Sequence, residues 1–69
     1  MRVIKVSSSN IAQVGYDDAI RELTVEFHSG KTWKYQNVYP ETFKGLVHAD
    51  SIGGYFGKFI KPHHKGQES

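Results

Sequence analysis

The sequence contains no cysteine, two prolines and one methionine among its 69 residues. The absence of cysteine excludes disulfides, thiolate metal sites and thiol nucleophiles, and it favours a reducing compartment. No apolar run approaches the roughly 20 residues that a membrane-spanning helix needs. The start of the chain also lacks the apolar segment and cleavage site of a secretory signal. We therefore predict a cytoplasmic protein with no membrane contact.

The chain is short, so its core must be small. A domain of this size buries only about 60% of the surface that its unfolded chain exposes. Hydrophobic residues make up 38% of the sequence and aromatic residues 13%, which is too much for a disordered segment. We predict one domain over residues 1–61 and a flexible basic tail over residues 62–69.

Four segments show the alternation that is typical of β-strands. It is clearest in residues 20–27, where Leu23, Val25 and Phe27 share one face. Residues 28–31 then form a short connection with a glycine, so residues 32–38 are expected to pair with residues 20–27 as an antiparallel hairpin. Two further strands are predicted over residues 2–6 and 11–17, the second with Ala12, Val14 and Tyr16 on one face.

After Tyr39 the period of the hydrophobic pattern becomes helical. Pro40 suits the first turn of a helix, and Phe43, Leu46 and Val47 follow at helical spacing, which predicts a helix over residues 40–48. A second helix is predicted over residues 51–60.

Three glycines interrupt that second helix: Gly53, Gly54 and Gly57. Each costs about 1 kcal/mol relative to alanine inside a helix. Either a neighbouring backbone packs closely against the glycines, or the turn is irregular and open to a ligand.

These elements predict an α+β fold, in which a small antiparallel sheet of three to four strands packs against two short C-terminal helices. The predicted core consists of the inward-facing residues of each element. They are Val14, Tyr16, Leu23, Val25, Phe27, Trp33, Tyr35, Phe43, Leu46, Val47, Ile52, Phe56 and Phe59.

Several short motifs together resemble those of one known family. They are Ser8-Ser9-Asn10-Ile11, Val14-Gly15-Tyr16-Asp17, Leu23-Thr24-Val25-Glu26-Phe27 with Ser29-Gly30, Trp33-Lys34-Tyr35, and Ala49-Asp50-Ser51-Ile52-Gly53 with Tyr55-Phe56. The sequence resembles the KTSC domain, which occurs at the C-terminus of some lysyl-tRNA synthetases and as small separate proteins. It departs from the family in having Trp33 in place of a tyrosine and Gly57 where asparagine is more usual. The resemblance implies a small α+β fold and, through the synthetases, RNA binding.

Basic residues are concentrated in the second half of the chain. Residues 31–69 carry six lysines against three acidic residues, and no acidic residue lies between Lys58 and Lys65. This asymmetry favours an anionic partner such as RNA or single-stranded nucleic acid, although a solvated tail would show the same pattern. The candidate contact residues are Lys34, Tyr39, Lys58, Lys61 and Lys65.

Aromatic residues near the second hairpin strand admit two interpretations. Trp33, Tyr35 and Tyr39 could stack on unpaired bases. A chain this short nevertheless needs aromatic residues in its core, which favours burial of Trp33 and Tyr35. Tyr39, at the junction of strand and helix, is the better candidate for base contact.

The start of the second helix is a weaker candidate for anion binding. Ser51 and Gly53 could leave backbone N–H groups open to a phosphate. An ordinary N-cap by Ser51 explains the same residues, and neighbouring Asp50 would repel an anion.

No arrangement of residues in the sequence predicts catalysis, a metal or a cofactor. The neighbours His63 and His64 point their side chains apart, and His48, Asp50 and Ser51 are too close in sequence to align as a triad. We therefore expect a non-enzymatic binding module for RNA or single-stranded nucleic acid. The alternative is an adaptor domain that docks a protein partner through a sheet edge or an exposed aromatic patch. The pattern leaves the oligomeric state open.

Overall fold

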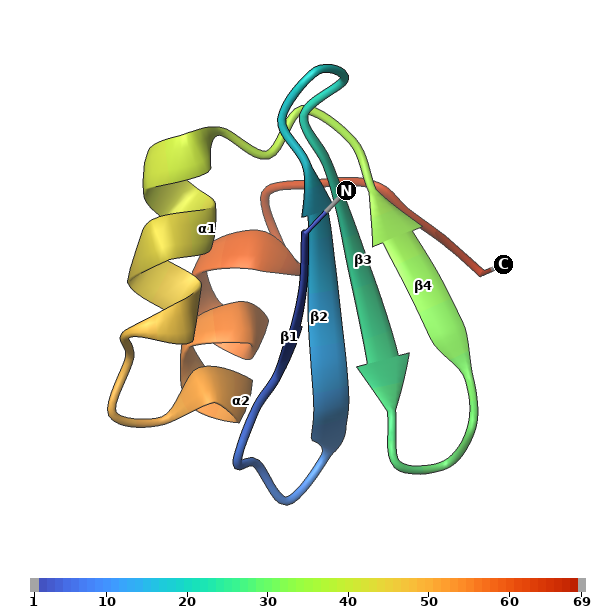
Figure 1. Ribbon diagram of the computed structural model, residues 1–69, viewed down its shortest axis with the longest axis vertical. Helices are drawn as coiled ribbons and strands as arrows, with labels where there is room; N and C mark the ends of the chain where they lie inside the picture. The colour runs from blue at the N-terminus through green and yellow to red at the C-terminus, as the bar shows by residue number, and fades with distance from the viewer. Residues whose placement is uncertain (1, 69) are drawn as a thin grey trace.

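The fold is a single antiparallel sheet with helices on one face (Figure 1). The computed structural model describes residues 2–68. Its five strands lie in sequence order: β1 (Arg2–Lys5), β2 (Ile11–Asp17), β3 (Glu22–Phe27), β4 (Thr32–Tyr35) and β5 (Gly66–Glu68). The helices are α1 (Pro40–Val47), α2 (Ile52–Tyr55) and the π-helix η1 (Phe56–Ile60), which continues directly from α2. The predicted α+β class is confirmed, with one more strand than the largest predicted number.

The β3–β4 hairpin forms as predicted. Leu23 pairs with Tyr35 and Val25 with Trp33. Gly30 closes the turn with φ at +94°, a conformation that glycine adopts without strain, and its N–H donates to the Phe27 carbonyl over 2.9 Å.

An irregularity in β2 changes which residues face the core. Ile11 pairs with Phe27, but Gln13 pairs with Glu26, so Ala12 is an extra residue in the ladder. This bulge turns Ile11 to the same face as Val14, and Ile11 is fully buried. The prediction that Ala12, and not Ile11, would share the inner face was wrong because strict alternation takes no account of bulges.

The predicted strand over residues 32–38 ends at Tyr35. Asn37 adopts a left-handed conformation with φ at 61°, which breaks the strand and turns Val38 into the core. The Val38 N–H donates to the Arg21 carbonyl over 3.0 Å, and the Tyr16 hydroxyl donates to the Val38 carbonyl.

The second predicted helix has an irregular second half. The Lys61 N–H donates to the Phe56 carbonyl over 2.9 Å, five residues back, as in a π-helix. With this wider turn, the side chains of Phe56 and Ile60 are both buried in the core. Phe59 is 47% exposed, so its predicted place in the core was wrong, and Ile60 fills that place.

Most of the remaining core is as predicted. Eight of the predicted residues are buried: Val14, Tyr16, Leu23, Val25, Tyr35, Phe43, Leu46 and Phe56. Four others are partly buried and pack against these: Phe27, Trp33, Val47 and Ile52.

The predicted tail contributes a strand to the sheet. In β5, Gly66 pairs with Tyr35 and Glu68 with Trp33, so the fold extends beyond the predicted boundary at residue 61. The ring of His64 also makes a hydrogen bond with the Gln36 carbonyl at 3.1 Å. A side chain at position 66 would overlap the Tyr35 ring, which explains why glycine stands there.

Within residues 2–68, no helix is long and apolar enough to cross a bilayer.

Two buried tyrosines should make the domain less stable at alkaline pH. Burial raises the pKa of Tyr16 and of Tyr35 above the ordinary value of about 10. The unfolded chain therefore releases these protons first, and the free energy of unfolding should fall as pH rises above about 10. Urea titrations at about pH 9 and about pH 11 should show this loss, and Tyr16→Phe should reduce it. An equal loss in the variant would show that Tyr16 does not contribute.

Candidate functional site

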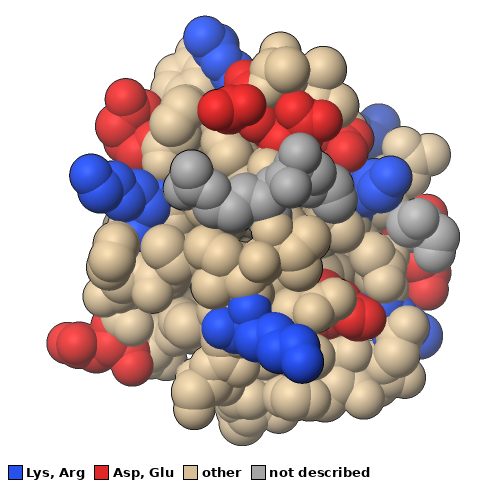
Figure 2. Space-filling view, in the orientation of Figure 1, with Lys and Arg blue, Asp and Glu red and all other residues tan. Residues whose placement is uncertain are grey.

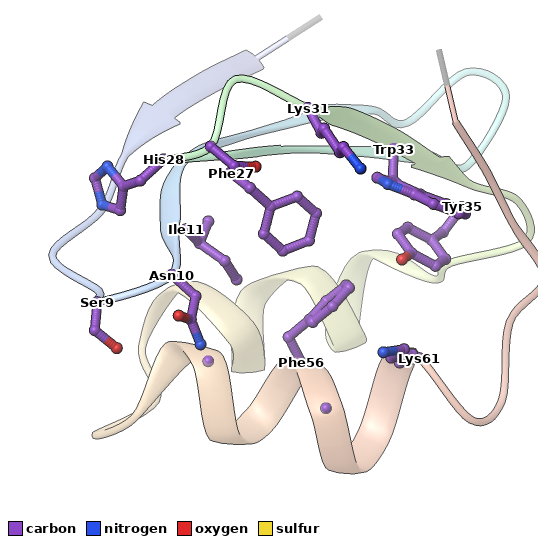
Figure 3. Close-up of a pocket in the computed structure, with 13 residues that line it drawn as sticks. Ser9, Asn10, Ile11, Phe27, His28, Lys31, Trp33, Tyr35, Phe56 and Lys61 are labelled. Carbon is purple, nitrogen blue, oxygen red and sulfur yellow. The ribbon is translucent and has the colours of Figure 1, made fainter.

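A groove lies between the β3–β4 hairpin, from its turn along β4, and helices α2 and η1 (Figure 3). Its volume is about 700 Å³. We call it the aromatic groove. It is lined by Ser9, Asn10, Ile11, Phe27, His28, Ser29, Lys31, Trp33, Tyr35, Gly53, Phe56, Gly57 and Lys61.

Aromatic rings form the walls of the groove. Phe27, Trp33 and Tyr35 project from the strands towards Phe56 of η1 (Figure 3). The edge-on pairs Phe27–Phe56 and Tyr35–Phe56 have ring centroids 5.9 and 5.3 Å apart. Tyr35 and Phe56 are buried by these contacts, whereas Trp33 is half-buried and keeps part of its indole accessible. Tyr35 is thus a core residue, and Trp33 is both a packing residue and part of the groove surface.

Two lysines lie at the end of the groove that contains Trp33. Lys31 extends from the β3–β4 turn, and Lys61 follows η1 on the opposite wall (Figure 3). Both are exposed, and among the described residues that line the groove none is acidic. The Trp33 end therefore combines an aromatic surface with positive charge that no acidic lining residue neutralises.

The glycines of the second helix shape the other wall. A Cβ atom at Gly57 would meet no other atom within 4 Å, so this position faces open space in the groove. A Cβ atom at Gly53 would lie 3.5 Å from the Ser8 Oγ, an ordinary contact with a side chain, and no neighbouring backbone atom lies within 4 Å of it. The close backbone contact offered as one explanation is therefore absent at Gly53 and Gly57, whereas the turn is irregular, as the other explanation predicted.

The far end of the groove is polar and carries no Lys, Arg, Asp or Glu. It is formed by Ser9, Asn10 and His28 (Figure 3). His28 makes two hydrogen bonds that fix the loop: its N–H donates to the Asn10 carbonyl, and its Nε2 bonds the Ser8 carbonyl, both at 2.9 Å.

Of the predicted contact residues, only Lys61 lines the aromatic groove. Lys34 is on the opposite face of the sheet, because side chains alternate along β4 and Trp33 and Tyr35 face inward. Tyr39 is 55% exposed, but it lies outside the groove with the Arg21 guanidinium 4.8 Å from its ring centroid.

Lys58 and Lys65 are exposed and also lie outside the groove. The Lys58 ammonium is 5.6 Å from the centroid of the Phe59 ring. On the face shown in Figure 2, basic side chains are separated by acidic ones and form no continuous patch. Of the predicted lysines, Lys61 alone lines the aromatic groove.

Ser51 caps helix α2. Its side-chain oxygen accepts the Gly54 N–H over 3.2 Å, which occupies one of the N–H groups that an anion would need. Gly53, the other residue of the weak anion-site hypothesis, lines the aromatic groove. Across residues 2–68, no group of three or more His, Asp and Glu side chains could hold a metal ion.

The residues predicted from the sequence to contact a ligand do not include Lys31, Asn10 or His28. These residues come from two separate connections, and only the sheet register brings them beside η1. The glycine pattern was the one sequence signal that pointed to an open surface on this helix.

A second hollow of about 710 Å³ lies between β1, β2 and α1. Its lining includes Asp18 as well as Lys44 and His48. This mixed charge suits an anionic ligand less well than the lining of the aromatic groove does.

The fold is that of a small α+β domain with a groove between its sheet and its second helix. The sequence model of the KTSC domain matches residues 7–64. The chain belongs to the KTSC domain family.

Some of the similar proteins are small separate chains. Others are larger enzymes in which the matching segment is only a small part. An uncharacterised protein of Stutzerimonas stutzeri is 39% identical over 93% of this chain and 90% of its own length. A lysine–tRNA ligase of Nostoc punctiforme is 39% identical over 86% of this chain but only 10% of the ligase. The crystal structure of a KTSC domain protein from Yersinia pestis superposes with a TM-score of 0.93 at 29% identity, covering 99% of this chain and 96% of that one.

Proposed function

We propose that this domain is a non-enzymatic module that binds single-stranded nucleic acid, and RNA in particular, in the aromatic groove. One observation carries the proposal: a half-buried tryptophan and two lysines share a groove whose described lining contains no acidic residue. An indole surface can stack on any base, and each such contact contributes about 1 to 3 kcal/mol. Lysines supply the phosphate contacts that such sites require.

The family membership supports RNA as the polymer. A domain of this kind forms part of a lysine–tRNA ligase, an enzyme whose name specifies an RNA substrate. Since the sequence lacks cysteine, we place the activity in the cytoplasm.

The geometry revises the residues that we assign to binding. Trp33 is the stacking residue, and Lys31 and Lys61 contact phosphate. Lys34, Lys58, Lys65 and Tyr39 lie outside the groove and should contribute less.

The salt dependence of binding should separate these two sets of lysines. Each phosphate contact on a single strand contributes about 0.7 to the slope of log K against log salt concentration. Lys61→Ala should therefore weaken binding and flatten the slope by about 0.7. Lys58→Ala is the matched control, because it removes the same charge three residues earlier in the chain, within η1 but outside the groove. Fluorescence polarisation with a labelled single-stranded RNA measures both.

Equal changes in the slope for the two variants would contradict the assignment of the groove. Absence of binding to RNA or DNA by the wild-type protein below about 100 μM at low salt would rule out the proposal itself, because electrostatic attraction is strongest there.

One observation favours a protein partner as the second candidate. Strand β1 is an edge of the sheet and carries Val3, which is 55% exposed. An extended segment of another protein could add to this edge through backbone hydrogen bonds. Val3→Lys should then abolish capture of such a partner and leave RNA binding unchanged.

A further inference from the structure

Strand β1 has backbone groups that are free to bind a further strand. It stands first in the sheet order, and among the strands of residues 2–68 it pairs with β2 alone. The Val6 N–H donates to the Ala12 carbonyl over 3.3 Å, and in an antiparallel ladder every second residue points its backbone groups to the same neighbour, so Ile4 also bonds towards β2. The N–H and carbonyl groups of Val3 and Lys5 therefore point away from the sheet.

The second hollow adjoins this edge on the inner face of the sheet. Ile4 lines it from β1, and Phe43 and Val47 line it from α1. Ile4 and Val47 are only partly buried, so the domain leaves some of their apolar surface uncovered. In a strand added to β1, every second side chain would point to this same face beside Ile4 and enter the hollow.

The two ends of the hollow differ in charge. Asp18 lies in the turn between β2 and β3, beside the start of α1 (Figure 1). Helix α1 runs away from this turn, with Lys44 in its second half and His48 directly after it. All three side chains are exposed. Strand β1 also runs away from the turn, so an antiparallel strand beside it would begin near Lys44 and His48 and end near Asp18.

We propose that the β1 edge and the second hollow together bind an extended segment of another protein, in which an acidic residue precedes apolar residues at alternate positions. This inference rests on the second candidate function, a protein partner at β1, and adds the chemistry of that partner. Backbone hydrogen bonds to Val3 and Lys5 hold the segment. The apolar side chains fill the hollow, and the acidic side chain lies at the end that carries Lys44.

The test begins with random peptides of about ten residues, longer than an average strand, displayed on phage and selected on the wild-type protein. The enriched peptides should share the acidic residue and the alternating apolar residues that follow it. A labelled synthetic copy of the most enriched peptide is then titrated by fluorescence polarisation. Serine in place of one inward-facing apolar residue should weaken its binding by about 10- to 150-fold.

Methylation of single backbone nitrogens tests strand addition without any change to the protein. Only every second N–H of an added strand faces β1. Methylation should therefore abolish binding at alternate positions of the peptide and be tolerated at the positions between them.

Lys44→Glu tests where the peptide lies. It should lower the affinity by about 2- to 5-fold, and a peptide with lysine in place of its acidic residue should regain that loss. Lys58→Glu is the matched control, because it makes the same change in an exposed helical lysine outside both the hollow and the aromatic groove. It should leave the affinities for both peptides unchanged.

The outcomes keep this inference apart from the functions on which it builds. If Val3→Lys abolishes peptide binding but Lys44→Glu acts no differently from Lys58→Glu, the edge binds a partner and the role of the hollow is overturned. Enriched peptides without the alternation, or equal effects of methylation at all positions, also overturn the inference. If no peptide is enriched, the inference and the second candidate function both fail, whereas RNA binding in the aromatic groove is tested separately by Lys61→Ala.

Discussion

Phe56→Ala should lower the free energy of unfolding by about 3 to 5 kcal/mol, the usual effect of removing a buried phenylalanine ring. Phe56 is 6% exposed, and its ring packs edge-on against both Phe27 and Tyr35. A chain of this length has a total stability of only about 3 to 10 kcal/mol. The variant should therefore be largely unfolded at 25 °C, which circular dichroism and urea titration will measure.

Phe59→Ala is the matched control for this loss. Phe59 lies in the same π-helix but is 47% exposed, and its ring contacts the ring of Tyr55 at a centroid distance of 4.8 Å. Its removal should change the free energy of unfolding by no more than about 1 kcal/mol. Similar losses for the two variants would contradict the wide turn that buries Ile60 in place of Phe59.

Gly57→Leu should block the aromatic groove without unfolding the domain. A side chain at this position meets no atom within 4 Å of its Cβ and enters the groove. Removal of a helical glycine should leave the free energy of unfolding unchanged or raise it by up to about 1 kcal/mol. Loss of a stacked base should weaken RNA binding by about 5- to 150-fold.

Ala19→Leu provides the control for added apolar bulk. Ala19 is exposed in the turn between β2 and β3, outside the groove. This variant should bind RNA as the wild-type protein does. If Gly57→Leu is folded and binds with unchanged affinity, the nucleic acid does not occupy the groove.

The candidate site was only partly predictable from the sequence. Lys61 was identified from local charge, and the glycines of the second helix indicated an open or closely packed surface. The other candidates lie outside the groove; they are Lys34, Tyr39, Lys58 and Lys65. The position of a lysine in the sequence does not specify which way its side chain points in the fold. In β4 the side chains alternate between the two faces of the sheet, so Lys34 points away from the face that carries Trp33.

The sequence by itself determined the α+β class, the β3–β4 hairpin and helix α1. Each depends on local features, namely strict alternation around a glycine turn, or proline followed by apolar residues at helical spacing. Five of the eight predicted core residues that are buried lie in these elements: Leu23, Val25, Tyr35, Phe43 and Leu46.

Only the tertiary structure decided the bulge that buries Ile11, the turn at Asn37, the π-helix that exchanges Phe59 for Ile60, and strand β5. These features have a common physical cause. Each departs from the regular local geometry and is stabilised by contacts with residues that are distant in the sequence. The local sequence pattern therefore does not reveal it. The aromatic groove depends on the same long-range contacts: Asn10, Lys31 and Lys61 line one groove only because the sheet register and the packing of the second helix bring their segments together.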